Sequence, residues 1–173
     1  MVLEFITARD YNLMRRVHRW PAPRWIRVWM ICATRGGDGW LWYAMGIIIL
    51  LFGGPARFGA VAAASLAAGL GIAVFIVLKK RANRKRPCAI EPHCWSKLLP
   101  PDRFSFPSGH TITAFAVALS LSAFYPSLLA GLLFCAGSIA LSRIVLGMHF
   151  LSDVVAGALI GSGLAYGAVW LIR

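Results

Sequence analysis

Apolar and polar residues alternate in long blocks along this chain of 173 residues. Five apolar runs, each bounded by glycine, proline or charged residues, cover residues 40–52, 58–78, 111–125, 128–141 and 149–172. A helix needs about 20 residues to cross roughly 30 Å of hydrocarbon, and the shorter runs approach that length when the polar residues at their ends are included. The pattern predicts an all-α fold, a polytopic transmembrane helix bundle of about five spans.

Residues 1–36 follow a different pattern, in which apolar positions are interleaved with arginines. Residues 1–19 suit an amphipathic helix at the membrane interface, which Pro21 and Pro23 end. Residues 24–34 carry tryptophans beside two arginines and are too short to span. We predict one membrane-embedded domain, residues 1–173, with interfacial helices in 1–36 and the helix bundle in 38–173. If residues 11–35 crossed instead, there would be six spans and the N-terminus would change sides.

Composition excludes a water-soluble globular protein. Hydrophobic residues make up 59% of the chain and charged residues 14%, with a mean hydropathy of +0.70. The net charge of +12 and the pI near 10.6 would suggest nucleic acid in a soluble protein. Beside apolar spans these charges fit membrane flanks and anionic lipid headgroups, so we expect a membrane partner and no nucleic acid. The first twenty residues lack the continuous apolar core of a cleavable signal peptide.

Three polar clusters interrupt the apolar pattern between residues 79 and 153. They are Lys79 with Arg86-Pro87, then Pro107-Ser108-Gly109-His110, then Ser142-Arg143 with His149 and Asp153. The first follows the second apolar run, the next precedes the third run, and the last lies between the fourth and fifth runs. If each of these runs crosses the membrane once, all three clusters lie on one membrane face.

The clusters contain residue types that bind or attack phosphate. Asp153 follows His149 by four positions, so its carboxylate can hold one imidazole nitrogen and leave the other free to attack. Arg143 can clamp phosphoryl oxygens through its planar guanidinium. Ser108 can cap the helix that follows it, where Gly109 and free N–H groups favour an anion. Together these properties predict a phosphate-hydrolysing site.

Plainer interpretations stay open for each cluster. Lys79 and Arg86 would share one side of a continuing helix, yet cations commonly flank a span. His110 fits an interfacial position at a helix start equally well. A metal site is the main rival for the histidines, but His110, His149 and Asp153 supply three ligands at most. We therefore predict no metal and no cofactor.

The four cysteines fall into two groups. Cys32 and Cys135 lie in apolar runs and fit buried small side chains, whereas Cys88 and Cys94 flank a polar loop. The latter two would form a disulfide if that loop faced an oxidising compartment. The pattern does not predict an oligomeric state.

Taken together, the three clusters resemble the signature of the type 2 phosphatidic acid phosphatase family. The matching patterns are Lys79-x6-Arg86-Pro87, Pro107-Ser108-Gly109-His110 and Ser142-Arg143-x5-His149-x3-Asp153. This family includes bacterial undecaprenyl pyrophosphate phosphatases, glucose-6-phosphatase and vanadium haloperoxidases. The resemblance covers about residues 40–173, which makes residues 38–173 the expected catalytic part.

The resemblance implies a role for each residue of the signature. His149 would form a phosphohistidine, Asp153 would orient it, and His110 would protonate the departing oxygen and later activate water. The phosphoryl oxygens would be held by Lys79, Arg86, Arg143, Ser108 and the Gly109 N–H. The implied enzyme is a hydrolase of phosphoric esters or diphosphates that needs no metal.

The implied function is that of an integral membrane lipid phosphatase. A site at headgroup depth favours an amphiphile that enters laterally, such as undecaprenyl pyrophosphate, phosphatidic acid, phosphatidylglycerol phosphate or a lipid A phosphate. A non-catalytic membrane lipid carrier is the alternative from another class. A soluble haloperoxidase would not contain five apolar spans.

Two observations conflict over the orientation of the site. On the predicted topology, all of the 18 lysines and arginines except Arg57 and Arg173 lie on the side of the clusters. By the positive-inside rule that side is cytoplasmic. The resemblance instead indicates a multi-pass protein of the bacterial cytoplasmic (inner) membrane with its site at the periplasmic face, which is the orientation we expect.

Overall fold

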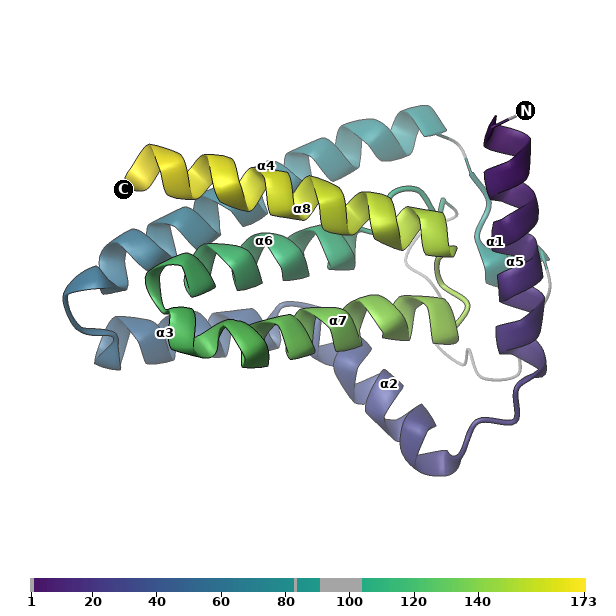
Figure 1. Cartoon of the computed structure of the whole chain (residues 1–173), viewed down its shortest axis with the longest axis horizontal. Helices are drawn as coiled ribbons and strands as arrows, with labels where there is room; N and C mark the ends of the chain where they lie inside the picture. Colours follow the sequence, from purple (N-terminus) through teal and green to yellow (C-terminus); the bar gives the residue numbers. More distant parts are fainter. Residues whose placement is uncertain (1, 83, 91–103) are drawn as a thin grey trace.

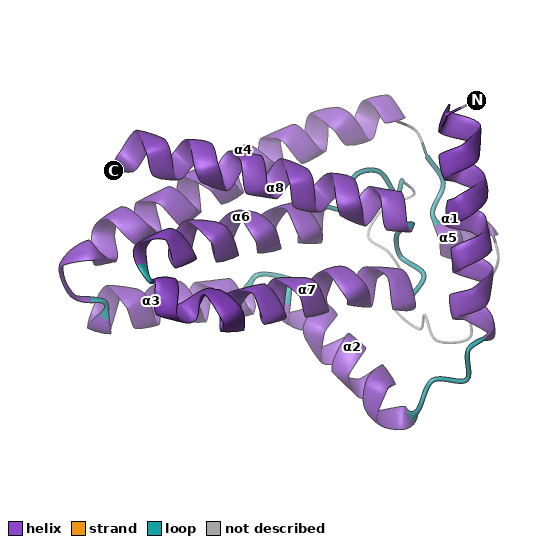
Figure 2. Cartoon of the chain, in the orientation of Figure 1, coloured by secondary structure: helices purple, strands orange, loops and turns teal. Residues whose placement is uncertain are grey.

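The computed structural model describes residues 2–82, 84–90 and 104–173, and it is helical almost throughout (Figure 2). The α-helices are α1 (Val2–Arg19), α2 (Arg24–Gly36), α3 (Trp40–Phe52), α4 (Arg57–Ala82), α5 (Pro87–Ile90), α6 (Gly109–Phe124), α7 (Leu129–Val145) and α8 (Leu151–Ile172). Short 3-10 turns, Gly54–Ala56 and Pro126–Leu128, precede α4 and α7. The all-α prediction is confirmed.

Five of the helices, α3, α4, α6, α7 and α8, form a bundle in which α6 packs against α4, α7 and α8 (Figure 1). Three segments of the described chain are long and apolar enough to cross a membrane: Gly54–Ala82, Pro126–Val145 and Leu151–Ile172. The apolar helices α3 and α6 have 13 and 16 residues. At 1.5 Å per residue they reach about 20 and 24 Å, short of the hydrocarbon thickness by themselves.

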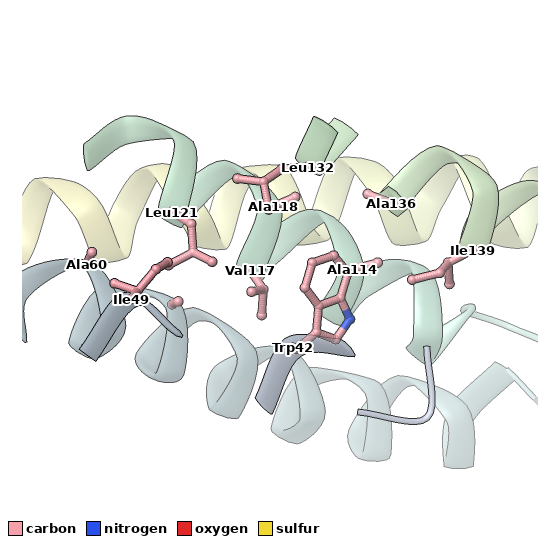
Figure 3. Close-up of a cluster of buried hydrophobic side chains, with 11 residues drawn as sticks. Trp42, Ile49, Ala60, Ala114, Val117, Ala118, Leu121, Leu132, Ala136 and Ile139 are labelled. Carbon is pink, nitrogen blue, oxygen red and sulfur yellow. The ribbon is translucent and has the colours of Figure 1, made fainter. Parts of the chain in front are cut away.

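Small side chains let the central helices approach closely. Ala114, Ala116 and Ala118 of α6 are fully buried. Larger apolar side chains fill the neighbouring space, where Trp42 and Ile49 of α3 face α6 (Figure 3). On α8, a Cβ atom at Gly161 would collide with the carbonyl oxygen of Ile112, so the two backbones are in direct contact there. Close approach of this kind compensates for the weak hydrophobic drive between helices in lipid.

Replacing Gly161 by alanine should therefore lower the thermal unfolding temperature in detergent. The added methyl group forces α6 and α8 apart, and overpacking of this type costs about 1–3 kcal/mol. Gly163→Ala is the matched control, because nothing lies within 4 Å of a Cβ at that position of the same helix. Equal unfolding temperatures for the two variants would contradict this account of the α6–α8 contact.

The N-terminal helices lie outside the bundle. Helix α1 runs across one end of it (Figure 1), with Asp10 and Met14 buried and the arginines at positions 9, 15, 16 and 19 exposed. Helix α2 packs against α7, with Met30 fully buried. Non-helical residues 20–23 separate the two helices, and neither is long and apolar enough to span. Two separate N-terminal helices were predicted, and a single crossing by residues 11–35 is not formed.

Among the cysteines, Cys32, Cys88 and Cys135 carry free thiols. Cys94, the expected partner of Cys88, lies outside the described residues.

Candidate active site

The ends of α4, α6, α7 and α8 next to the three polar clusters lie at one end of the bundle, as the alternation of spans predicted (Figure 1). Backbone hydrogen bonds join them. The Ser108 N–H donates to the Asp153 carbonyl at 3.1 Å, and the Cys88 N–H donates to the Gly147 carbonyl at 3.1 Å. The Ser105 N–H donates to the Arg84 carbonyl at 2.8 Å. These bonds connect segments that are far apart in sequence and set the spacing of the side chains between them.

A cavity of about 640 Å³ opens from this end into the bundle between α3, α4 and α6. Polar side chains line one part of its wall: Asp38, Arg86, His110, Arg143 and His149. Most of the remaining wall is apolar and includes Trp42, Val61, Ala64, Ile72, Phe75, Val117 and Leu121. The α4 residues from Val61 to Phe75 extend over about 20 Å at 1.5 Å per residue. The cavity is therefore polar at one end and mostly apolar along the rest, a distribution that matches a lipid with a charged head group.

His149 lies in the loop between α7 and α8. The last helix was expected to begin near His149; α8 begins at Leu151, and His149 itself precedes the N-cap, Phe150. The loop turns at Gly147, whose φ of 68° is disfavoured for other residues, and the His149 N–H donates to the Arg143 carbonyl at 3.0 Å. The loop thus places an imidazole that is only 3% exposed at the cavity wall.

Hydrogen bonding selects the tautomer of His149. Nδ1 lies 2.5 Å from the Ser105 carbonyl oxygen, which can only accept, so the ring proton is on Nδ1. Nε2 then carries a lone pair, which accepts from Nη1 of Arg86 at 3.3 Å. The nitrogen with the lone pair is the one suited to nucleophilic attack.

Asp153 is fully buried behind His149 and is held by other groups. Its Oδ1 accepts from Nη1 of Arg84 at 2.7 Å, and its Oδ2 accepts from the Phe150 N–H at 2.8 Å. Oδ2 lies 3.8 Å from Nδ1 of His149, an ion-pair distance, while the hydrogen bond from that nitrogen goes to the Ser105 carbonyl. Asp153 therefore acts on His149 chiefly through its charge in this arrangement.

Arg84 also joins the site to the N-terminal helix, a connection that the sequence did not indicate. Its Nη2 donates to Oδ2 of Asp10 at 2.7 Å, and Asp10 accepts further hydrogen bonds from Ser152. The guanidinium lies 4.2 Å from the ring centre of Phe150. Helix α1 is thereby fixed to the first turn of α8, next to Asp153.

Two guanidinium groups stand at the polar part of the cavity. Arg86 and Arg143 are 3% and 5% exposed. Nη1 of Arg86 donates to the Met148 carbonyl at 3.1 Å, and Nη1 of Arg143 donates to the Thr34 hydroxyl at 2.5 Å. Both guanidinium groups belong to residues that line the cavity, and their positive charge favours an anion there.

Lys79 stands apart from these arginines. Helix α4 ends at Ala82, so Lys79 and Arg86 do not share one continuing helix, contrary to the interpretation of their spacing. Nζ of Lys79 lies 4.4 Å from the ring centre of Phe75, which lines the cavity, but Lys79 itself does not line it.

The Ser108-Gly109-His110 segment begins α6. Ser108 occupies the N-cap, but its side chain does not cap the backbone as predicted: its buried Oγ accepts from the Thr111 hydroxyl at 2.9 Å. Gly109 and His110 line the cavity. Nε2 of His110 lies 2.8 Å from Oδ1 of Asp38, a residue of the turn between α2 and α3.

Within residues 2–82, 84–90 and 104–173, no group of three His, Cys, Asp or Glu side chains is arranged to hold a metal ion. The carboxylates and imidazoles of the site are instead paired with each other, with arginines or with backbone groups.

Burial lowers the pKa of His149 to about 4; Asp153 opposes this change, and the charges of Arg143 and Arg86 add to it. The ring is therefore expected to stay neutral at pH 6, where an exposed histidine is largely protonated. In the unfolded chain this histidine binds a proton below about pH 6.5, whereas in the folded chain it does so only near pH 4. The contribution of His149 to the free energy of unfolding therefore falls as the pH drops from about 6.5 towards 4.

Nitrogen-15 NMR of histidine-labelled protein in micelles tests this expectation, with the His149 signals assigned by their loss in His149→Ala. At pH 6 the spectrum should show a neutral ring with its proton on Nδ1. Half-protonation of His149 near pH 6.5 would contradict the burial described above.

Known proteins resemble this chain in sequence and in fold. A family model described as the PAP2 superfamily matches residues 60–173. The structure is similar to that of LpxE from Aquifex aeolicus, with a TM-score of 0.79 and 30% identity over 92% of this chain and 94% of that one. It also shares the fold of a PAP2-type phosphatidylglycerolphosphate phosphatase from Bacillus subtilis, with a TM-score of 0.74 and 21% identity over 96% and 85% of the chains.

Two curated relatives are similar in sequence over shorter stretches. An acid phosphatase of Zymomonas mobilis is 40% identical over an alignment of 93 residues, with a coverage of 49% of this chain and 34% of the relative. A decaprenylphosphoryl-5-phosphoribose phosphatase of Mycolicibacterium smegmatis is 35% identical over 107 residues, or 60% of this chain and 55% of the relative. The matched part thus spans from about a third to about half of these relatives.

Proposed function

Because the chain belongs to the PAP2 superfamily, we propose that it is a membrane lipid phosphatase that hydrolyses a phosphomonoester or diphosphate at the end of a lipid. The observation that carries this proposal is the cavity, in which His149, Arg86 and Arg143 stand at one end and apolar side chains line the rest. A phosphate head fits beside the cations and a hydrocarbon tail fits along α3, α4 and α6. Water-soluble phosphates would leave the apolar part of the cavity unused.

The first half of the proposed reaction transfers the phosphoryl group to His149. The Nε2 lone pair attacks phosphorus, the bond from phosphorus to the lipid oxygen breaks, and His110 gives that oxygen its proton. The developing negative charge lies next to Arg86 and Arg143, whose guanidinium forks match phosphoryl oxygens. Asp153, at 3.8 Å from Nδ1, stabilises the positive charge that the ring gains.

The second half releases inorganic phosphate. His110, now neutral, takes a proton from a water molecule, and the hydroxide attacks phosphorus as the bond to Nε2 breaks. His149 returns to its neutral form, and His110 is protonated again. Gly109 lines the cavity, which supports the proposed contact of its N–H with a phosphoryl oxygen, whereas Lys79 and Ser108 do not line it and stay predicted contacts. No step in this scheme calls for a metal.

The test is phosphate release by detergent-solubilised protein from mixed micelles that contain phosphatidic acid, phosphatidylglycerol phosphate, undecaprenyl pyrophosphate or a lipid A phosphate. At least one of these lipids should yield inorganic phosphate, at a rate that EDTA does not change. Lipid binding without phosphate release would indicate a carrier, and loss of activity in EDTA would restore a metal mechanism.

We place the protein in the cytoplasmic membrane of a bacterium, with the site at the periplasmic face. This orientation is the one that the resemblance to the family implies, against the bias of basic residues. Helix α8 carries the C-terminus to the opposite end of the bundle from the site (Figure 1), so a green fluorescent protein fused there should fold and fluoresce in the cytoplasm. A fusion that is expressed but does not fluoresce would show that the C-terminus is periplasmic and that the site faces the cytoplasm.

A further inference from the structure

A carboxylate from the N-terminal region reaches the second histidine of the site. Asp38 stands in the turn between α2 and α3, and its Oδ1 lies 2.8 Å from Nε2 of His110, 72 positions away in the sequence. A weaker contact of 3.8 Å joins Oδ2 of Asp38 to Nη1 of Arg35. The Asp38 side chain is 41% exposed, which leaves it room to move when a ligand enters.

The turn that carries Asp38 is pressed against the imidazole. A Cβ atom at Gly37 would lie 3.1 Å from Cδ2 of His110 and 2.9 Å from Cγ2 of Ile139. A side chain at this position would therefore push the turn away from α6 and α7. The short distance from Asp38 to His110 is thus set by close packing of the turn.

The charges around His110 include two cations, which disfavour its protonated form, and one carboxylate, which favours it. Arg86 and Arg143 line the same cavity and oppose a positive charge on the His110 ring. Of the described residues that line this cavity, Asp38 is the one with a carboxylate. A general acid must carry its proton when the substrate arrives, and a carboxylate at 2.8 Å from Nε2 favours the protonated ring.

We propose that Asp38 is a positioning residue for the phosphatase reaction, which holds the transferable proton on Nε2 of His110. This inference rests on the proposed function. In the resting site the Nε2–H donates to Asp38. When the substrate binds, its bridging oxygen shares the Nε2–H with Oδ1 of Asp38, and the proton moves to the bridging oxygen as the bond to phosphorus breaks. His110 is left neutral, and its Nε2 lone pair then accepts the proton of the attacking water.

This role predicts a dependence on the leaving group. A lipid alcohol is a poor leaving group without a proton, whereas a nitrophenolate departs unprotonated. Asp38→Asn keeps the size of the side chain and removes its charge. It should lower kcat/KM for the lipid phosphate by about 10- to 100-fold, a part of the usual contribution of general acid catalysis. For p-nitrophenyl phosphate, kcat/KM should change by less than about threefold. Because kcat/KM reports the steps up to departure of the alcohol, slow hydrolysis of the phosphoenzyme does not obscure the comparison.

Arg35→Gln is the matched control, since it removes the 3.8 Å contact to Asp38 and leaves the contact to His110 in place. Both of its kcat/KM values should stay near wild type. Equal losses for the two substrates in Asp38→Asn, or no loss for either, would overturn the role of Asp38, and unfolding temperatures identify a merely structural effect. Failure of the wild type to hydrolyse any phosphate would instead overturn the proposed function, and this inference with it.

Discussion

Replacing His149 by alanine is expected to reduce lipid phosphate hydrolysis by at least about 10³-fold, or about 4 kcal/mol of transition-state stabilisation. The reason is geometric: Nδ1 is engaged by the Ser105 carbonyl at 2.5 Å, so Nε2 at the cavity wall is the nitrogen that can attack. Without this nitrogen, a phosphate held by the cations of the site has no nucleophile to attack it. Phosphate release in mixed micelles measures the loss.

A second variant separates loss of the nucleophile from loss of the fold. The side-chain amide of Asn in His149→Asn can still donate to the Ser105 carbonyl, yet it cannot attack phosphorus. Both variants should be inactive, and His149→Asn should keep nearly the wild-type unfolding temperature. Brief mixing of wild-type protein with labelled substrate should also yield an acid-labile phosphoenzyme that both variants lack. A well-folded variant with more than about a tenth of wild-type activity would remove His149 from the mechanism.

Arg86→Lys is expected to have the next largest effect, a fall of about 10²-fold in kcat/KM. Nη1 of Arg86 donates to the Met148 carbonyl at 3.1 Å and lies 3.3 Å from Nε2 of His149, and the residue lines the cavity. A lysine ammonium is a point charge on a flexible stem and cannot satisfy these directions together. Because the contact forms at the reacting nitrogen, the loss should appear mainly in kcat.

Arg81→Lys provides the control for Arg86. Arg81 belongs to the last turn of α4 and is exposed, so it should tolerate the same exchange without a measurable change. If Arg86→Lys also stayed within about threefold of wild type, the guanidinium would be serving only as a positive charge. A large loss in Arg86→Lys with unchanged unfolding temperature supports its contact with the phosphoryl group.

The helices were predictable because the signals for them are local. Residues 40–52 coincide with α3, and the third and fourth apolar runs lie within a few residues of α6 and α7. Apolar length, together with glycine and proline at the ends, indicates a membrane helix without reference to any other segment. Helix α4 extends beyond the second apolar run through Lys79, Lys80 and Arg81, because backbone hydrogen bonds do not depend on apolar side chains.

The site was predictable only in part. His110, Arg86, Arg143 and His149 could be grouped because spans that alternate in direction bring their ends to one face. Ser105 gave no signal, since it contacts His149 through a backbone carbonyl that every residue possesses. Asp38 gave a weak one, because acidic residues are rare here, with 6 Asp and Glu against 18 Lys and Arg. In a chain with so few carboxylates, each one is a candidate partner for a cation or a histidine of the site.

By itself the amino-acid sequence determined that this is a helical membrane protein and which histidines and cations would share a membrane face, because hydrophobic length and the alternation of spans act along the chain. Tertiary structure alone decided which nitrogen of His149 is free, that Arg84 holds Asp153, and that Asp38 reaches His110. A hydrogen bond forms or fails over a few tenths of an ångström, and that distance depends on the packing of helices distant in sequence.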